Sequence, residues 1–248
     1  MTDNKEGFIT AVRGEDRFRT KIDWLDGRHS FSFGSHWDPT NTHHGLLLVN
    51  NEDRVRAASG FSTHPHRDME IVTWMIGGEL EHKDSMGNKG IIYPGLAQRM
   101  SAGTGILHSE KNDGVSGGTS GTHFVQMWVV PDQDGIRPGY QEADVRELLD
   151  RGGLVPVAAG ERVPDAAITI RQRDAALWVA RLGAGEVVTL PDAPFLHVFV
   201  ARGAVELEGA GALSAGDAVR VRGEGGQHVT GSAEGAEVIV WEMHATLG

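Results

Sequence analysis

The chain has 248 residues, with 34 acidic and 23 basic side chains and a formal net charge of −11 when its 12 histidines are counted as neutral. An acidic surface repels phosphate backbones and anionic lipids, and we find no basic patch, so we expect no direct nucleic-acid binding and no membrane binding. Cysteine is absent, which excludes disulfides, thiolate metal sites and cysteine nucleophiles. The first ten residues mix charges, and no apolar run reaches the length of a membrane span, so the sequence predicts a cytoplasmic protein.

The predicted elements in chain order are short strands separated by turns rich in Gly, Asn and Asp. Glycine accounts for 34 residues, about twice its usual share, which is typical of a chain with many turns. Runs of β-branched and aromatic residues predict strands at 45–50, 70–76, 79–82, 90–93 and 123–130, then at 176–182, 186–190, 196–200, 204–208, 218–221 and 237–243. Such strands at short spacing favour two β-sandwiches or barrels.

One segment between the two β-rich halves has helical spacing. Val145, Leu148 and Leu149 follow a turn-like Pro138-Gly139, and they predict a helix over 141–150. We interpret this segment as part of a linker.

Histidine is concentrated in the first half, where nine of the 12 lie between His29 and His123. Two patterns are prominent there: His64-Pro-His66 and His108-Ser-Glu110. Residues i and i+2 of a strand project from the same face, so two neighbouring strands can direct four ligands to one point. Three imidazoles and a carboxylate suit Fe, Mn, Co, Ni, Cu or Zn and leave that choice open. The alternative is that these histidines alternate along their strands without binding a metal.

Two further features bear on this region. Pro65 has no backbone N–H, which predicts an edge strand or a bulge. Apolar side chains of the same half are expected to be core rather than to line an aromatic pocket: Phe61, Trp74, Met75, Met100, Phe124, Met127 and Trp128.

The segments that carry the histidines resemble known motifs. GFSTHPHRDME, which starts at Gly60, resembles the first cupin motif, and GILH, which ends at His108, resembles the second. The wording of RHSFSFGSHWDP, HPHRDMEIVTW, GELEHKDSMGNKG and QRMSAGTGILHSE is similar to the pirin family in particular. The resemblance covers about Arg28 to Pro131.

The resemblance implies an all-β fold of two tandem cupin barrels, each a double-stranded β-helix of jelly-roll type, joined by a short helical linker. It implies a metal-binding domain over 1–132, a linker over 133–165, and a degenerate cupin domain without a metal site over 166–248. The metal ligands that it implies are His64, His66, His108 and Glu110. The implied cofactor is one divalent transition metal ion, with Fe(II) favoured and Cu, Mn, Ni, Co or Zn as alternatives.

The identity of the carboxylate ligand is a choice between two glutamates. Cupins at large would use Glu70, whereas pirins use Glu110. Glu70 lies four residues beyond His66, about 13 Å along an extended strand, so it needs a bend to reach the same ion. We therefore favour Glu110 and predict that Glu70 is a hydrogen-bonding or structural carboxylate, of the kind that orients a ligand imidazole. A plain surface glutamate is the alternative for Glu70.

The resemblance also implies a function. Bacterial pirins similar to this chain are associated with quercetin 2,3-dioxygenase activity, which implies a metal-dependent enzyme that opens a flavonol ring with O2 and releases carbon monoxide. Glu110 would be the catalytic proton acceptor. One alternative is a non-enzymatic, iron-binding, redox-sensitive regulator that acts through a protein partner, like an animal member of the family. Another is a metal-independent or isomerase-type cupin. An enzyme needs a pocket of about 300 Å³ or more beside the metal, and a regulator does not.

Overall fold

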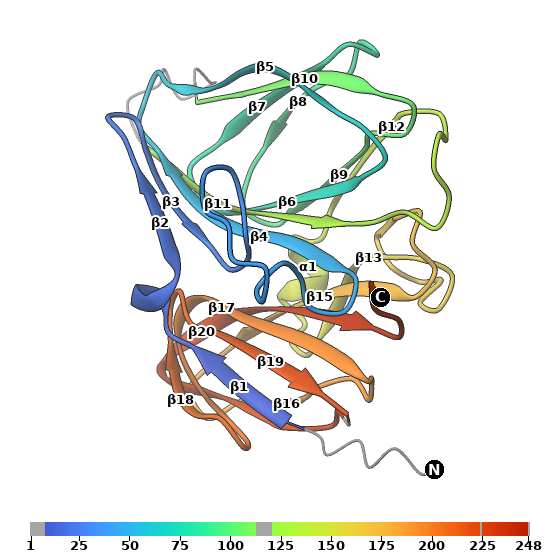
Figure 1. The fold of residues 1–248 in the computed structure, drawn as a ribbon. Coiled ribbons are helices and arrows are strands. Elements are labelled where there is room, and N and C mark those ends of the chain that lie inside the picture. The colour runs from blue at the N-terminus through green and yellow to red at the C-terminus, as the bar shows by residue number, and fades with distance from the viewer. Residues whose placement is uncertain (1–7, 113–120, 224, 248) are drawn as a thin grey trace.

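Strands dominate the computed structural model, which describes residues 8–112, 121–223 and 225–247. They form three sheets: two enclose the upper barrel of Figure 1, and one curls into the lower barrel. The only helices of the described residues are the 3₁₀ turn η1 (Gly14–Asp16) and α1 (Arg146–Leu149). No helix of the described residues is long and apolar enough to cross a membrane.

The middle layer of the molecule is a seven-stranded antiparallel sheet in the order β12-β9-β6-β11-β4-β3-β2. Its strands are β2 (Phe18–Lys21), β3 (Leu25–His29), β4 (Leu47–Val55), β6 (Glu70–Gly77), β9 (Leu96–Ser101), β11 (Thr122–Val129) and β12 (Gly139–Asp144).

The upper barrel is closed by a four-stranded antiparallel sheet in the order β5-β10-β7-β8 (Figure 1). The strands are β5 (Gly60–His66), β7 (Leu80–Asp84), β8 (Lys89–Ile92) and β10 (Ile106–Lys111). The edge position predicted from Pro65 is confirmed, because β5 lies at the end of this sheet and Pro65 pairs only with Leu107 of β10.

The lower barrel is a nine-stranded sheet whose path runs β1-β19-β17-β20-β15-β13-β14, with β16 paired to β20 and β18 to β17. The strands are β1 (Phe8–Val12), β13 (Val155–Ala159), β14 (Ile168–Thr169), β15 (Ala175–Leu182), β16 (Val187–Thr189), β17 (Phe195–Leu207), β18 (Gly211–Ser214), β19 (Ala218–Arg222) and β20 (His228–Met243).

Two strands of this sheet lie outside the range 166–248. β1 pairs antiparallel with β19, so residues near the N-terminus complete the C-terminal barrel. β13 pairs with β15, although its residues lie within the expected linker. The division into 1–132, 133–165 and 166–248 stays a proposal, and strand pairing crosses both of its boundaries.

The helix predicted over 141–150 is wrong in its first half. Only Arg146–Leu149 is α-helical, and residues 139–144 form β12 along the edge of β9. The side chain of Gln141 reinforces this pairing, since its Oε1 accepts hydrogen bonds from Arg99 and from the backbone N–H of Thr169. These partners come from other parts of the chain, and local spacing cannot reveal them.

The largest cluster of the apolar core lies between the two barrels. Along β6 and β11, alternate side chains point in opposite directions, so both faces of the middle sheet are buried. Trp74 and Met127 pack toward the C-terminal half, with Leu177 and Trp241, whereas Met75 and Phe124 pack inside the upper barrel. The expectation that these residues are core is confirmed for the four side chains of β6 and β11 named here. One polar contact crosses the same boundary, because Trp74 Nε1 donates to Glu237 Oε1 at 3.0 Å.

We predict that Trp74→Phe lowers the free energy of unfolding by about 1 to 3 kcal/mol, because it leaves an acceptor of the buried Glu237 without its donor. Urea denaturation followed by circular dichroism measures this change. The control is Trp37→Phe, at a side chain that is 73% exposed, where we expect almost no effect. Equal losses in both variants would show that the contact between the barrels contributes nothing.

Candidate metal centre

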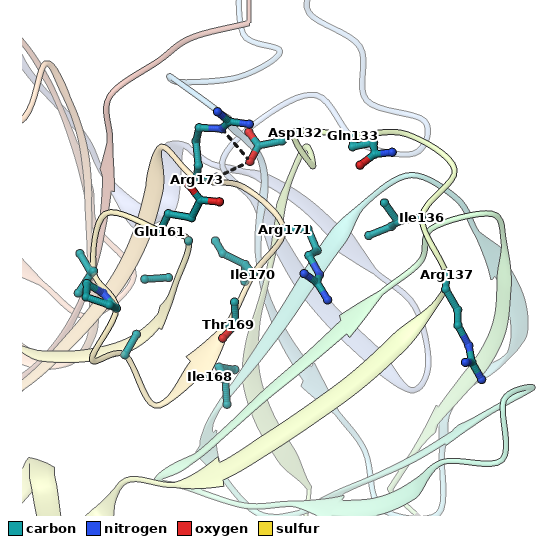
Figure 2. Close-up of a pocket in the computed structure, with 15 residues that line it drawn as sticks. Asp132, Gln133, Ile136, Arg137, Glu161, Ile168, Thr169, Ile170, Arg171 and Arg173 are labelled. Atoms are coloured by element: carbon teal, nitrogen blue, oxygen red, sulfur yellow. Dashed lines mark hydrogen bonds and ion pairs between the residues drawn. The ribbon is translucent and has the colours of Figure 1, made fainter.

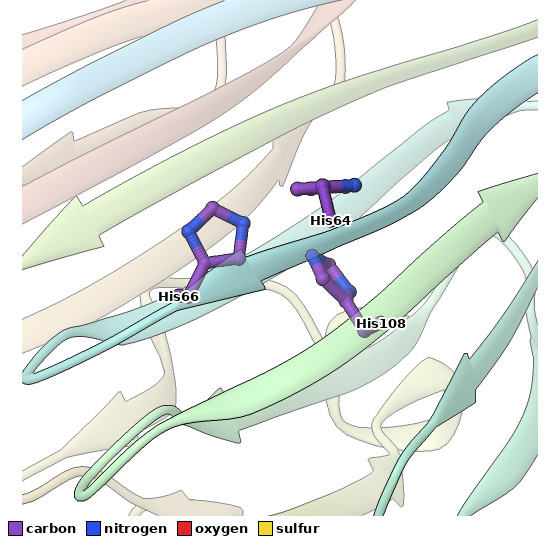
Figure 3. Close-up of side chains that lie close together, drawn as sticks. All are labelled: His64, His66 and His108. Carbon is purple, nitrogen blue, oxygen red and sulfur yellow. The ribbon is translucent and has the colours of Figure 1, made fainter.

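The register between β5 and β10 brings three histidines together. His64 lies directly opposite His108, and His66 lies opposite Ile106, two residues before His108. The three ring centroids are 4.5 to 4.9 Å apart, and Figure 3 shows the rings converging from the two neighbouring strands. The convergence predicted from the two i, i+2 patterns is therefore present for all three histidines.

The nitrogen atoms of this cluster have lone pairs free to bind a metal. His64 Nδ1 lies 2.7 Å from the carbonyl oxygen of Ser62; because a carbonyl only accepts, Nδ1 carries the proton and Nε2 is left as an acceptor. His66 Nε2 and both nitrogens of His108 are buried with no hydrogen-bond partner among the described residues. A buried polar atom without a partner costs about 1 to 3 kcal/mol, which a bound cation would offset. One nitrogen atom from each ring can be chosen so that the three atoms lie within 4.8 Å of one another, and this cluster can therefore hold a metal ion.

Burial keeps two of the imidazoles in the neutral form that a metal requires. Desolvation, together with the neighbouring His64, lowers the pKa of His66 to about 4. Desolvation and the other histidines lower the pKa of His108 to about 2. Both rings are therefore uncharged at neutral pH, and binding a metal there displaces no proton.

Glu110 lies two residues beyond His108 on β10, opposite His82 of β7, and it is outside the group of three. Its carboxylate is buried and accepts two hydrogen bonds from Gln126 Nε2, at 2.8 and 3.0 Å. Burial raises the pKa of Glu110 to about 7, and the bonds from Gln126 oppose that shift. Its assignment as a metal ligand stays a prediction.

Gln126 and Trp128 of β11 form a hydrogen-bonded chain to Glu110, a role that was not predicted from the sequence. Trp128 Nε1 donates to Gln126 Oε1 at 3.0 Å. Because an indole N–H only donates, this bond directs the amide N–H groups of Gln126 toward Glu110. The Trp128 ring also meets His66 edge to face, with centroids 4.8 Å apart. Gln126 is a polar residue inside an apolar strand, and that break in the pattern is the signal that could have identified it.

A second buried pair adjoins His108. His82 Nε2 lies 3.2 Å from Asp84 Oδ2, and the His82 ring packs between His108 and Tyr140. His82 and Asp84 of β7 lie opposite Glu110 and His108 of β10, respectively. All four side chains therefore share the inner face of this sheet. His82 and Asp84 have the same i, i+2 spacing as the two ligand patterns, and this spacing could have identified the pair from the sequence.

Glu70 faces away from the histidines, toward the C-terminal half. Its Oε2 accepts hydrogen bonds from Ser101 Oγ at 2.9 Å and from the backbone N–H of Arg171 at 3.0 Å. It is fully buried, which excludes the alternative of a surface glutamate. Its contacts are structural, and its hydrogen-bond partners among the described residues include no imidazole.

A buried carboxyl group on β4 lies near Glu110. Asp53 pairs in register with Gly27, where an added Cβ would lie 2.4 Å from Asp53 Oδ1, so glycine makes room for the carboxyl group. Burial and the charge of Glu110 raise the pKa of Asp53 to about 7. The barrel thus holds two carboxyl groups that favour the protonated form.

Comparison with known proteins agrees with this geometry. The family model described as Pirin matches residues 12–129, and the model described as "Quercetinase C-terminal cupin domain" matches residues 157–243. A protein of Mycobacterium tuberculosis named "Putative quercetin 2,3-dioxygenase" is 58% identical over 240 residues, covering 97% of each chain. The chain belongs to the pirin family.

Other pirins extend this result to the fold. The crystal structure of the bacterial pirin YhhW from Escherichia coli, in complex with nickel(II), superposes with a TM-score of 0.85 at 29% identity and covers 97% of this chain and 100% of its own. A relative in Escherichia coli named "Quercetin 2,3-dioxygenase" is 44% identical over 134 residues, which is 54% of this chain and 57% of that protein. The predicted all-β fold of two tandem cupin barrels with a short helical linker is confirmed.

We predict about one transition-metal ion per purified chain, lost in His108→Ala because that ring supplies a central ligand. Elemental analysis after dialysis measures the occupancy. The control is His228→Ala, which removes an exposed histidine of the C-terminal half that pairs with Glu208. Undiminished metal in His108→Ala, or two ions per chain, would contradict the assignment.

We predict that Asp53→Asn stabilises the metal-free protein more at pH 8 than at pH 5. The folded-state pKa of Asp53 is raised from 3.8 to about 7, so between these values the folded state binds more protons than the unfolded state. The wild type therefore loses stability as pH rises through this window, and the variant lacks that loss. Urea titrations at the two pH values test this, with Asp165→Asn at an exposed position as the control. If the stability difference between Asp53→Asn and the wild type became smaller from pH 5 to pH 8, the prediction would be contradicted.

Proposed function

We propose that this pirin is a metal-dependent dioxygenase that opens the ring of a flavonol-like aromatic substrate with O2 and releases carbon monoxide. The observation that carries the proposal is the convergence of three imidazoles with free lone pairs, with the buried carboxyl group of Glu110 two residues beyond His108 on the same strand. The names of the relatives in Mycobacterium tuberculosis and Escherichia coli support the same activity.

We propose His64, His66, His108 and Glu110 as the ligands of one divalent ion, with Fe(II) favoured. The nickel complex of YhhW supports keeping Ni(II) among the alternatives, with Cu, Mn, Co and Zn. When bound, such an ion supplies Lewis acidity toward a 3-hydroxy-4-keto group and a common site for substrate and O2.

Glu110 is proposed as the acceptor of the substrate hydroxyl proton. A bound cation would favour the carboxylate form of Glu110, which is the form that can accept a proton. Gln126 holds both carboxylate oxygens, and Trp128 fixes the orientation of the Gln126 amide, so the base is positioned before the substrate arrives. These two residues act through Glu110.

An open pocket adjoins His66 at the C-terminal end of β5. Its volume is about 500 Å³, and its lining includes His66 together with Pro65, Arg67, Ile106 and Leu107. Small-molecule sites span about 300 to 1,000 Å³ and are mostly apolar, so this space is large enough for an aromatic ligand. Leu107 is 47% exposed and alternates with the buried His108 along β10, so its apolar surface lies on the outer face of this sheet.

We predict that the metal-loaded protein bleaches quercetin with O2 uptake and carbon monoxide release, and that Glu110→Gln is far slower. Glutamine keeps the reach of the side chain but cannot accept a proton, which should lower kcat by about 10² to 10⁴. The matched variant is Glu70→Gln, at a carboxylate that contacts Ser101 and Arg171, where we expect a much smaller loss. All rates are compared at equal metal occupancy, measured on the assayed samples.

Two outcomes would contradict this scheme. Normal turnover in Glu110→Gln with an inactive Glu70→Gln would show that the carboxylate assignment is wrong. Absence of turnover with Fe(II), Cu(II), Mn(II), Ni(II) and Co(II), together with partner binding that follows the iron oxidation state, would favour the regulator.

A further inference from the structure

A second cavity lies where the loop after β11 meets β13 and β14. Its volume is about 690 Å³, and it is lined by residues 132–137 of one half and 159–173 of the other. Figure 2 shows side chains from both segments facing this space, with Arg171 near its centre. None of the three clustered histidines lines it.

Arginine is the distinctive residue of this cavity. Arg137, Arg171 and Arg173 line it, and only Arg173 has an acidic partner, Asp132, whose Oδ2 lies 3.4 Å from Arg173 Nε. Among the described residues, the guanidinium groups of Arg137 and Arg171 make no hydrogen bond, ion pair or ring contact. Only two other described arginines share that condition, Arg151 and Arg202, and neither lines this cavity. In a chain with a net charge of −11, two unpaired cations thus face one cavity.

The backbone of Arg171 is fixed while its side chain is free. Its N–H donates to the buried Glu70 Oε2 at 3.0 Å, and its carbonyl accepts from the N–H of Asp132 at 2.7 Å. The next residue, Gln172, donates from Nε2 to the carbonyl of Val130 at 2.9 Å. The segment that carries Arg171 is therefore tied to the N-terminal half at three points. Such anchoring lowers the conformational entropy that a ligand must remove on binding.

Arg99 and Glu70, a buried pair of opposite charges, lie near Arg171. Arg99 is largely buried in the middle sheet, and its Nε donates to the carbonyl of Thr169, which lines the cavity. Burial lowers the pKa of Arg99, the charge of Glu70 raises it, and the nearby charge of Arg171 lowers it. The charges of Arg99 and Glu70 oppose each other, so the charge offered to the cavity is that of Arg171 itself.

The remaining walls specify what kind of anion fits. Ile136 and Val163 are half-buried and line the cavity together with Pro164, and Ile168 and Ile170 are buried, so the cavity has an apolar wall. Its acidic side chains are Asp132, which Arg173 neutralises, and Glu161, which Figure 2 places on the Arg173 side, across the cavity from Arg137. A planar guanidinium group matches a carboxylate with two parallel hydrogen bonds.

We propose that this cavity is a binding site for a small organic carboxylate with an apolar body, held by Arg171 and Arg137 through its carboxylate and by the isoleucines through its body. The inference does not depend on the metal centre or on the proposed dioxygenase activity.

The test is calorimetric titration of the full chain with benzoate and with benzamide, a neutral molecule of the same shape. We expect saturable binding of benzoate at one site per chain and binding of benzamide at least about tenfold weaker, because the charge-assisted hydrogen bonds are lost. Arg171→Gln and Arg137→Gln should each weaken benzoate binding by about tenfold. Arg151→Gln and Arg202→Gln remove the same charge from exposed, unpaired arginines elsewhere and should leave the affinity unchanged.

A carboxylate can also bind a metal, so the titration is repeated after treatment with a chelator, and the affinity should be unchanged. Circular dichroism of each variant establishes that it is folded. Benzoate binding that survives both cavity substitutions, falls equally in the control variants, disappears with the metal, or is matched by benzamide would overturn the proposal. No detectable binding at millimolar benzoate would also overturn it.

Discussion

Burial of the middle sheet on both faces is the constraint on which the rest of this structure depends. Along β6 and β11, every residue must suit either the space between the barrels or the interior of the upper barrel. A slip of one residue would exchange the two faces and bring buried polar groups into the wrong environment. The register of these strands is therefore strongly determined, and it places Gln126 on the barrel side while its neighbours Val125 and Met127 pack toward the C-terminal half.

That register links the two sheets of the upper barrel at one polar contact. Gln126 belongs to the middle sheet and Glu110 to the histidine-bearing sheet, and their hydrogen bonds cross the barrel. The same apolar surroundings keep His108 neutral and favour the protonated form of Glu110, because burial penalises charge of either sign. A cation at this point would reverse the preference of Glu110, since an opposite charge favours the carboxylate. The site is therefore organised around a charge that the protein itself does not supply.

The opposite face of the same sheet carries a different chemistry. Glu70 and Arg99 point toward the C-terminal half, where Glu70 fixes the backbone of Arg171 and leaves its guanidinium group free. The two barrels thus meet at an apolar core that is bordered by a cationic cavity. The C-terminal barrel has no His-x-His pattern, and here it contributes to a surface between the halves.

The sequence by itself determined the fold class and the family, and it placed His64 and His66 on one face of a strand, because the alternation of side chains is local. The pairing of β5 with β10 then brought His108 to them. Pro65 likewise marked an edge strand, since a missing N–H is a local property. Tertiary structure decided what depends on partners distant in the chain. Residues 139–144 became a strand because the edge of β9 was free to pair with them. Residues 8–12 joined the far barrel through β19. Glu70 turned to Arg171, and Arg137 and Arg171 came to line one cavity. No local pattern encodes these contacts, because each one exists only when segments of the two halves pack together.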